Sequence, residues 1–560
     1  MTGGKDVSKT STATWLRSGA PGVWLSAGAV SVAVIMTLGL LVLIAIRGLG
    51  HFWPSDVLEA TYQVPGQVPV SVIGEVVQRE PMSRTESEAI NEPPSNTKAA
   101  TRVLLKTGNR DLNGQDFHWV AERWLTAPEF PEDLVTVERQ EWGNFYGRLV
   151  RLKQAGQVIA EGEGAWSALP ARLARTHALV AELAHLQKSE VGGINHSLER
   201  LRLQSRKLEL EGALTATAQA DIASERAALD ARYQTLEARL DELRTLADRD
   251  SALFSDATGH QVEVSLASIV RVYRPNAMDV MAKTRFYVNT LWTFLSTGPR
   301  EANTEGGVFP AIFGTVIMTL IMAVVVTPFG VLAAVYLREY AHQGWMTRLI
   351  RIAVNNLAGV PAIVYGVFGL GFFVYVLGGS IDRLFFPEAL PAPTLGTPGL
   401  LWASLTLALL AVPVVIVATE EGLARIPHSL REGSLALGAT KAQTLWKIVL
   451  PMASPAIMTG LILAVARAAG EVAPLMLVGV VKLAPSLPVD GNYPYVHLDQ
   501  KIMHLGFHIY DVGFQSPNVE AARPLVYATA LLLVAVIALL NLSAVAIRNH
   551  LREKYRTLDT

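Results

Sequence analysis

One charged pair lies inside a long apolar stretch of the sequence. Arg467 and Glu471 are four residues apart, and residues 453–481 around them contain no other charged side chain. An arginine at the centre of a membrane helix costs about 2.5–3.5 kcal/mol on insertion scales, so it needs a charged partner or an aqueous surface. A guanidinium presents planar donors that match the oxygens of an anion. Arg467 is therefore a candidate for binding an anion, and the alternative is a structural ion pair with Glu471 or with another subunit.

A second pattern with a possible function begins at Arg431, between two apolar stretches. It reads REGSLALGATKAQTLWKIVLP and ends at Pro451. Gly438 is typical of a turn and proline stops many helices, so we expect a short helix, a glycine turn and a second helix that ends at the proline. A helix–turn–helix of this kind on a membrane surface offers a compact docking surface to a soluble partner.

Six apolar stretches must position these residues. Each is long enough to cross the hydrocarbon core, and in lipid such a stretch is expected to be helical because its backbone polar groups need internal partners. They comprise residues 23–46, 308–337, 357–377, 399–419, 453–481 and 525–547. The first is longer than the apolar core of a signal peptide and lacks a small-x-small cleavage site after it, so we expect it to be retained.

The basic residues that flank the spans predict the orientation, because Lys and Arg are retained on the cytoplasmic side. With the N-terminus in the cytoplasm, the cytoplasmic segments carry Lys5, Lys9, Arg17, Arg338, Arg348, Arg351, Arg425, Arg431, Lys441, Lys447, Arg548, Arg552, Lys554 and Arg556. The short segments on the other side carry Arg383, Lys482, Lys501 and Arg523. We therefore expect both termini in the cytoplasm and residues 51–300 outside it.

Residues 51–300 differ in composition from the rest of the chain. They hold 61 of the 97 charged residues (48 basic and 49 acidic). Alternating apolar residues predict strands at 68–77, 102–107, 135–140 and 261–273. Ala155-Gly156 predicts a hairpin that joins residues 147–153 to residues 157–163. The exported block is therefore expected to begin and end as a β-rich module.

Residues 169–248 show a helical pattern instead. Their apolar residues recur every three or four positions, at Leu229, Tyr233, Leu236, Leu240, Leu243 and Ala247. This seam predicts a coiled coil. Gly192 and Gly193 predict a break, and hence an antiparallel hairpin of one short and one long helix. The hairpin is either a spacer or a docking arm, and charge patterns of this kind usually belong to a solvated surface.

Composition excludes several classes of site. The sequence has no cysteine, which removes disulfides, thiolate metal sites and cysteine nucleophiles. A net charge of −1 argues against a nucleic-acid-binding protein. His504 and His508 have no third ligand nearby in sequence, so they predict a surface pair rather than a metal site. No G-x-x-x-x-G-K-[ST] sequence occurs, so we expect no P-loop, and we also expect no catalytic residue, cofactor or metal.

The pattern that begins at Arg431 resembles the EAA loop of ABC importer permeases. That motif has a glutamate and two small residues, then a glycine, and closes with Ile-x-Leu-Pro. The matching residues are Glu432, Gly433, Ser434, Gly438, Ile448, Leu450 and Pro451. Gly433 and Ser434 replace two alanines and keep their small size. The resemblance implies a type I, MetI-like core of membrane helices, with the short helix of the loop in a groove of an ATPase subunit.

Three further segments, at 306–315, 356–366 and 466–474, are similar to the phosphate permeases of this class. The tail from Phe514 to Arg556 favours the PstA type over the PstC type. The resemblance leaves the exported block unassigned. It implies phosphate as substrate and, as partners, a second permease of the PstC type, a dimer of PstB-type ATPases and a periplasmic phosphate-binding protein.

The resemblance also gives the charged pair a role. Arg467 is expected to bind phosphate, and Glu471 to compete for the arginine so that the anion is released. Thr315 and Asn356 are polar groups that could face the same pathway, although threonine in a membrane helix more often bonds its own backbone. Two other interpretations stay open: a permease for sulfate or molybdate, and a membrane sensor or scaffold that uses the exported coiled-coil helices.

The predicted protein is an α-helical multi-pass protein of the bacterial inner membrane with six transmembrane helices, surrounded by lipid. Its parts are a cytoplasmic N-terminus (1–22), a first membrane helix (23–46), an α+β periplasmic insert (51–300) with a helical arm at about 169–248, a permease core (301–547) with the EAA loop at about 420–451, and a cytoplasmic tail (548–560).

Overall fold

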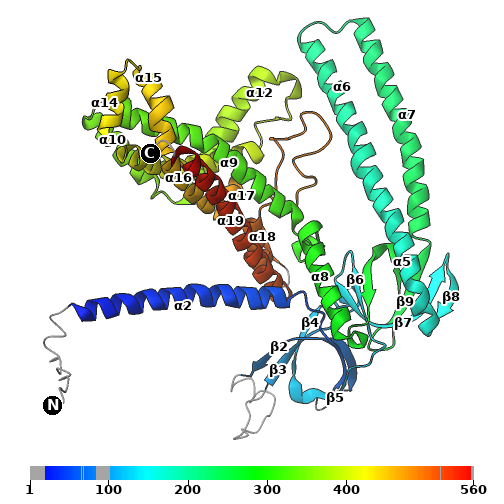
Figure 1. The fold of residues 1–560 in the computed structure, drawn as a ribbon. Coiled ribbons are helices and arrows are strands. Elements are labelled where there is room, and N and C mark those ends of the chain that lie inside the picture. The colour runs from blue at the N-terminus through cyan, green and yellow to red at the C-terminus, as the bar shows by residue number, and fades with distance from the viewer. Residues whose placement is uncertain (1–18, 65, 67, 83–100, 517–518, 557–560) are drawn as a thin grey trace, which may run out of the picture.

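Two bodies are distinct in the computed structural model, which describes residues 19–64, 66, 68–82, 101–516 and 519–556 (Figure 1). One is a group of membrane helices, and the other is a strand-rich module from which two long helices project. Lys5, Lys9 and Arg17, which contribute to the predicted orientation, lie outside the described residues, as do residues 557–560 of the predicted tail.

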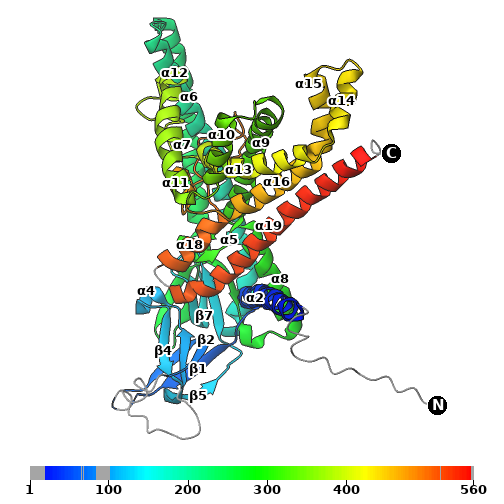
Figure 2. The same ribbon diagram turned by 90° about the vertical axis from the view of Figure 1, so that its left-hand side faces the viewer.

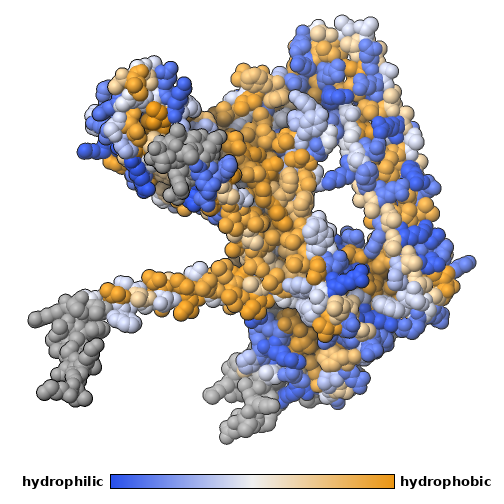
Figure 3. Space-filling model, viewed as in Figure 1, coloured by the Kyte–Doolittle hydropathy of each residue, from blue (hydrophilic) through white to orange (hydrophobic). Residues whose placement is uncertain are grey.

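Six helices of the described residues are long and apolar enough to cross a membrane, as predicted. Four of them match the predicted spans closely: α2 (Ala20–Gly50), α9 (Phe309–Val335), α13 (Leu400–Ala424) and α19 (Val519–Arg556). Apolar side chains cover the visible surface of the helices, whereas the module and its projecting helices are mainly hydrophilic (Figure 3). The chain is thus a multi-pass membrane protein with a large polar insert.

The third span begins later than predicted. Residues before Pro361 form a separate amphipathic helix, α10 (Trp345–Leu357). The span itself runs through α11 (Ala362–Phe368), a π-helical segment (Gly369–Gly378) and α12 (Gly379–Phe385). The two helices are separate because proline lacks the N–H that would continue α10.

The fifth span differs from its prediction at both ends. One continuous helix runs from Lys441 to Gly470 through α15 (Lys441–Thr444), a π-helical turn (Leu445–Val449) and α16 (Leu450–Gly470). The predicted stop at Pro451 is wrong, because the helix continues through the proline. A π-helical turn directly precedes α16, and such local adjustments let a membrane helix accommodate proline. The predicted end at 481 is also wrong, since the chain leaves the helix at Glu471 and resumes as α17 (Leu475–Val478).

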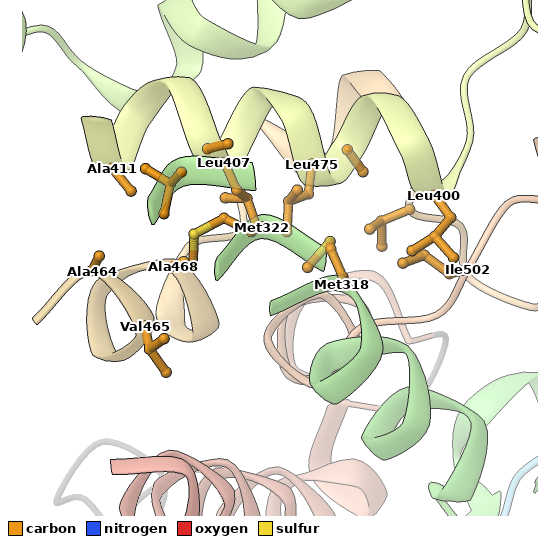
Figure 4. Close-up of a cluster of buried hydrophobic side chains, with 14 of the residues drawn as sticks. Met318, Met322, Leu400, Leu407, Ala411, Ala464, Val465, Ala468, Leu475 and Ile502 are labelled. Carbon is orange, nitrogen blue, oxygen red and sulfur yellow. The ribbon is translucent and has the colours of Figure 1, made fainter. Parts of the chain in front are cut away.

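Helices α9, α13 and α16 enclose a buried apolar cluster of the membrane core (Figure 4). Its buried members include Met318, Met322, Leu407, Ala411, Ala464 and Ala468. Small residues let the helices approach closely: a Cβ at Gly460 of α16 would lie 2.6 Å from the Ala418 Cβ of α13. Lipid tails are as apolar as these side chains, so close backbone packing, more than the hydrophobic effect, stabilises such contacts.

Two antiparallel sheets form the module. Their strand orders are β4-β3-β2-β1-β5 and β10-β9-β7-β6-β11, with β8 paired to β7. The strands are β1 (Val57–Tyr62), β2 (Val70–Pro81), β3 (Thr101–Lys106), β4 (Phe117–Ala121), β5 (Leu125–Glu129), β6 (Val135–Arg139), β7 (Asn144–Gln154), β8 (Gln157–Glu161), β9 (Asp250–Ser255), β10 (Gln261–Ser265) and β11 (Ile269–Tyr273). Strands occur near the first three predicted positions, as β2, β3 and β6, and the hairpin turns at Ala155-Gly156, where both residues have positive φ. The prediction of one strand at 261–273 is wrong, because the 3₁₀ turn Leu266–Ser268 divides it into β10 and β11, which lie at opposite edges of their sheet.

The helical arm has no break at Gly192 and Gly193, so that prediction is wrong. α5 (Gly162–His185) continues through a π-helical turn (Leu186–Val191) into α6 (Gly192–Leu210), and the chain reverses only at Gly212. Glycine weakens a helix interior by about 1 kcal/mol without stopping it, whereas Gly212 adopts the left-handed conformation, with φ 67°, that ends one. α7 (Ala216–Ala247) then returns, so the arm is a hairpin of two long helices.

The arm contacts the membrane core as well as the module. At its base, α5 packs on the sheet that contains β7 and β9. Further along, α6 packs against a 3₁₀ turn, Pro387–Ala389, which follows α12. That loop is itself anchored, because the buried Asp382 carboxylate accepts hydrogen bonds from Leu395 N (2.8 Å) and Gly396 N (2.6 Å). Openings remain between the arm and the core nearer the module (Figure 3).

A second connection between module and core was not predicted. It comprises α8 (Val280–Ser296) and a short hairpin of β12 (Pro299–Arg300) and β13 (Glu305–Gly306). On the module side, Glu301 pairs with Arg110 and accepts a hydrogen bond from Trp142 N. On the core side, Asn303 donates to Lys482 O (2.9 Å) and Asp511 Oδ2 (3.0 Å).

Candidate functional site

The predicted charged pair lies at the end of a helix. Arg467 occupies the last turn of α16, and Glu471 is the first residue beyond it, with ψ 134°. Arg467 Nε lies 3.5 Å from Glu471 Oε1, and the two side chains keep 35% and 24% of their surface exposed. The pair therefore forms at a break between α16 and α17, and the prediction that Arg467 lies at the middle of a continuous helix is wrong.

The helix ends at Gly470 for local reasons. Pro474 has no N–H with which to continue the hydrogen-bond ladder of α16. The intervening backbone is extended at Glu471, and Leu475 N then bonds to Val472 O (3.0 Å) to start α17. Interrupted membrane helices of this kind are typical of transporter binding sites, where the unwound backbone lines a cavity.

The other two predicted pathway residues lie in different environments. Thr315 is fully buried in α9, where its hydroxyl donates to Ala311 O (2.7 Å) and accepts from Leu505 N (2.9 Å). Asn356 is exposed near the end of α10, five residues before Pro361, which precedes the first residue of α11. Thr315 therefore connects α9 to α18 (Leu505–Tyr510) in this conformation, and the pathway role of both residues stays a prediction.

The prediction that His504 and His508 form a surface pair is wrong, since both are buried beside the core. His504 Nδ1 accepts a hydrogen bond from Gly506 N (3.1 Å) and thereby caps α18. Burial lowers the pKa of each imidazole to about 4. For His508 the Asp511 carboxylate opposes this shift and Lys482 adds to it. Among the described residues, no group of three His, Cys, Asp or Glu could hold a metal ion.

The predicted helix–turn–helix is present at the other end of the long helix. α14 (His428–Ala436) ends before Gly438, whose φ of 87° is the left-handed conformation that glycine adopts at low cost. Thr440 then caps α15 in a reciprocal capping box with Gln443. Ser434 is the replacement for a motif alanine, and its hydroxyl lies 2.9 Å from that of Thr444, which joins the two helices.

Unpredicted charged contacts fix this loop to the π-helical segment Tyr336–Tyr340, which follows α9. Arg431 donates to Glu339 Oε1 (2.9 Å), Leu423 O (2.8 Å) and Ile426 O (2.9 Å). Lys441 binds the Glu339 carbonyl and lies over the Tyr340 ring. The sequence contains one signal for this contact: Arg431 is a basic residue of the motif, and Glu339 is an acidic residue at the end of the second span.

The remaining motif residues are arranged in two sets. Glu432, Gly433 and Gly438 are exposed, and Ile448, Leu450 and Pro451 are partly buried at the junction of the π-helical turn with α16. Large apolar side chains on the loop also remain exposed, with Leu437 91% and Trp446 68% accessible. An apolar surface next to polar loop residues is typical of a protein interaction site.

Comparison with known proteins covers this same region. The model of the family described as "binding-protein-dependent transport system inner membrane component" matches residues 326–557. The chain is 37% identical over 262 residues to the "phosphate transport system permease protein PstA 1" of Mycobacterium tuberculosis (strain CDC 1551 / Oshkosh), covering 46% of this chain and 75% of the relative.

Two further relatives are also named as phosphate transport permeases. The PstA protein of Mycobacterium leprae is 34% identical over 276 residues, which cover 48% of this chain and 81% of the relative. The PstC protein of Xylella fastidiosa (strain 9a5c) is 32% identical over 209 residues, which cover 36% of this chain and 64% of the relative. With its membrane helices, its helix–turn–helix and these relatives, the chain belongs to the binding-protein-dependent transport permeases and, within them, to the PstA type.

Proposed function

We propose that this chain is one permease subunit of an ATP-driven phosphate importer. The observation that carries the proposal is the Arg467–Glu471 pair at a helix break, within a region similar to permeases whose names state phosphate transport. An exposed guanidinium beside unwound backbone offers planar donors to a phosphate oxyanion. Glu471 lies close enough to take the arginine back when the anion leaves, which keeps binding weak enough for release.

The same helix connects this pair to the loop that resembles the EAA motif. Lys441 and Gly470 are the ends of one continuous helix, so Gly438 precedes its start and Arg467 lies in its last turn. A force applied at α14 is therefore transmitted along a rigid element to the ion pair. We assign Glu432, Gly433, Ser434, Gly438, Ile448, Leu450 and Pro451 to coupling with a separate ATPase subunit.

The proposed assembly follows from the family and from the chemistry of the two ends. A PstB-type ATPase dimer would bind the exposed loop in the cytoplasm, and a PstC-type permease would complete the pathway. A periplasmic phosphate-binding protein would deliver the anion. We place the chain in the bacterial inner membrane with both termini in the cytoplasm and residues 51–300 in the periplasm, as the basic flanks of the spans favour.

The pathway role of Arg467 is tested by Arg467→Gln, which removes the charge and keeps most of the side chain. We expect radiolabelled phosphate uptake to fall to background in a strain that lacks the native permease, while the amount of inserted complex stays normal. Arg383→Gln replaces an exposed arginine of α12 and is the matched control. Normal uptake by Arg467→Gln would refute the pathway role, and competition by sulfate or molybdate would assign the pathway to another oxyanion.

The coupling role is tested at Gly438, whose φ of 87° is strained for any other residue. Gly438→Asp should leave the subunit inserted but uncouple uptake from ATP hydrolysis, because the turn that presents α14 is lost. Gly344→Ala is the control, since Gly344 has negative φ and open space around it. ATP-dependent uptake at the normal rate in Gly438→Asp would count against this role.

A further inference from the structure

A second interrupted helix lies beside the break that carries Glu471. The chain unwinds between α10 and α11, and the buried Tyr365 hydroxyl donates to Leu357 O (2.5 Å) across this gap. The bond joins the first turns of α11 to the last residue of α10. It therefore fixes the bend between the two helices, which Pro361 alone leaves free to vary.

This bend brings the backbone of α11 against the turn that follows Glu471. A Cβ at Gly366 would lie 2.7 Å from Pro474 Cα and 2.8 Å from Pro474 O, so the contact requires glycine. A Cβ at Gly506 of α18 would lie 2.5 Å from Val472 Cγ2. The turn at residues 471–474 thus makes close contacts with two glycines from elements that are distant in sequence.

Within α16, the hydrogen bond from Glu471 N to Ala468 O (3.2 Å) ties the Glu471 backbone to the helix end but does not fix its side chain. The residue has left the helix, so the regular i,i+4 spacing does not set the direction of its side chain. The order Arg then Glu is also the less favourable one for such a pair on a helix. The 3.5 Å separation from Arg467 therefore depends on where the surrounding elements place the turn.

We propose that Tyr365 and Gly366 are positioning residues of the transport site. They hold the turn that contains Glu471 close to Arg467, so that the ion pair between Glu471 and Arg467 can re-form when the anion leaves. The inference rests on the proposed phosphate pathway and adds the elements that set its geometry. Tyr365 acts through the bend between α10 and α11, and Gly366 acts through direct contact with Pro474. Neither residue is required to touch the anion.

The test uses the assembled importer in membrane vesicles and a single reporter thiol. The sequence has no cysteine, so Ala473→Cys places the only thiol of this chain, partly buried, within the turn. Labelling is measured on this subunit after the subunits are separated. We expect Tyr365→Phe to raise the rate at which a maleimide labels this thiol, because loss of the hydroxyl bond releases the bend. Tyr375→Phe is the matched control, since Tyr375 lies in the same span and is 62% exposed.

Transport is measured in the same variants without the reporter. Tyr365→Phe should lower the maximal uptake rate on the order of five-fold, the factor that corresponds to one lost hydrogen bond. The phosphate concentration at half-maximal uptake should stay unchanged, because delivery does not depend on the turn. Gly366→Ala should lower the maximal rate further, whereas Gly371→Ala, which places its Cβ in open space of the same span, should not.

The outcomes separate the two proposals. If labelling and uptake in Tyr365→Phe equal those of Tyr375→Phe, the positioning role is overturned even when Arg467→Gln abolishes uptake. Faster labelling with unchanged uptake also overturns it, because the turn then moves without effect on transport. Normal uptake by Arg467→Gln overturns the phosphate pathway itself, whatever the labelling shows. Because Gly366→Ala can fail to assemble, Tyr365→Phe carries the decision.

Discussion

The membrane core and the module are stabilised by different contacts. In the core, buried hydroxyls of α13 bond to their own helix: Ser404 donates to Leu400 O, and Thr406 donates to Trp402 O. Contacts between core helices depend instead on glycine and alanine, as at Gly460. In the module, the buried Glu138 carboxylate binds Arg271 and Arg300, which come from different elements.

The difference follows from the two solvents. Lipid offers no hydrophobic gain when two apolar helices meet, so the core depends on close approach of backbones. Water surrounds the module, so its strands bury apolar faces and its charged groups pair with one another across the sheets. A methyl group added where two core helices approach should therefore damage the core, and removal of a charge that pairs two elements should damage the module.

The largest expected effect is in the core. A Cβ at Gly314 of α9 would overlap the Met503 carbonyl oxygen, a backbone atom that cannot be moved without displacing α18. We expect Gly314→Val to yield no monodisperse protein after extraction and size-exclusion chromatography. Gly39→Val is the control, because a Cβ at Gly39 of α2 meets no atom within 4 Å. Equal yields from the two variants would break the comparison.

A smaller effect is expected from the buried charge of the module. Glu138→Gln leaves Arg271 and Arg300 without a countercharge, which should cost on the order of 3 kcal/mol. Thermal unfolding of the detergent-solubilised protein measures the loss as a lower first transition. On the arm, Glu242 pairs with Arg239, and the Glu242 side chain is 59% exposed. Glu242→Gln should therefore lower the free energy of unfolding by less than about 0.5 kcal/mol. A similar shift in both variants would contradict the assignment.

The two regions should also differ in their response to pH. Burial lowers the pKa of His508 to about 4, so in the folded chain the ring stays neutral well below its unfolded pKa of about 6.5. As the pH falls below about 6.5 the unfolded chain gains a proton that the folded chain does not, and stability is lost until about pH 4. We expect a loss on the order of 1–2 kcal/mol at pH 5 from this residue.

Glu138 should act in the opposite sense and at lower pH. Its burial raises the carboxyl pKa, but the charges of Arg271 and Arg300 outweigh this and leave the pKa below its usual value. Its contribution is therefore present at neutral pH and is lost only in acid.

The prediction for His508 is tested with the variant His508→Gln. Melting temperatures measured from pH 7 to pH 5 should fall less in His508→Gln than in the unaltered chain. Parallel curves would show that His508 does not titrate as proposed.

Sequence patterns located the elements better than they located the ends of the elements. Uncharged length was enough to find all six spans, whereas alternation found only part of the module, since β1, β4, β5 and β9 were not predicted. The ends depend on the backbone: Gly192 and Gly193 were expected to break α6 but only a π-helical turn precedes them, whereas Gly212 ends the helix. A glycine stops a helix when the chain must reverse there, and that requirement is a tertiary one.

The site shows the same limit. The spacing of Arg467 and Glu471 was enough to predict that the two side chains meet, as they do at 3.5 Å. The spacing did not indicate that Glu471 lies beyond the end of the helix. Pro474 removes the N–H that would continue α16, and the close contact of Gly366 with this turn comes from a different span. The burial of His504 and His508 was missed for a related reason, since the elements that cover them come from remote parts of the chain.

The contact between α6 and the turn Pro387–Ala389 has a mechanical consequence. A body that is joined to another at one point can pivot about it in any direction. The module is joined to the core at the hairpin around Glu301 and Asn303, and again through the arm. With two attachments, it can rotate freely only about the line that joins them. If the loop after α12 is displaced, the arm must therefore move with it, or the contact between α6 and this loop must break.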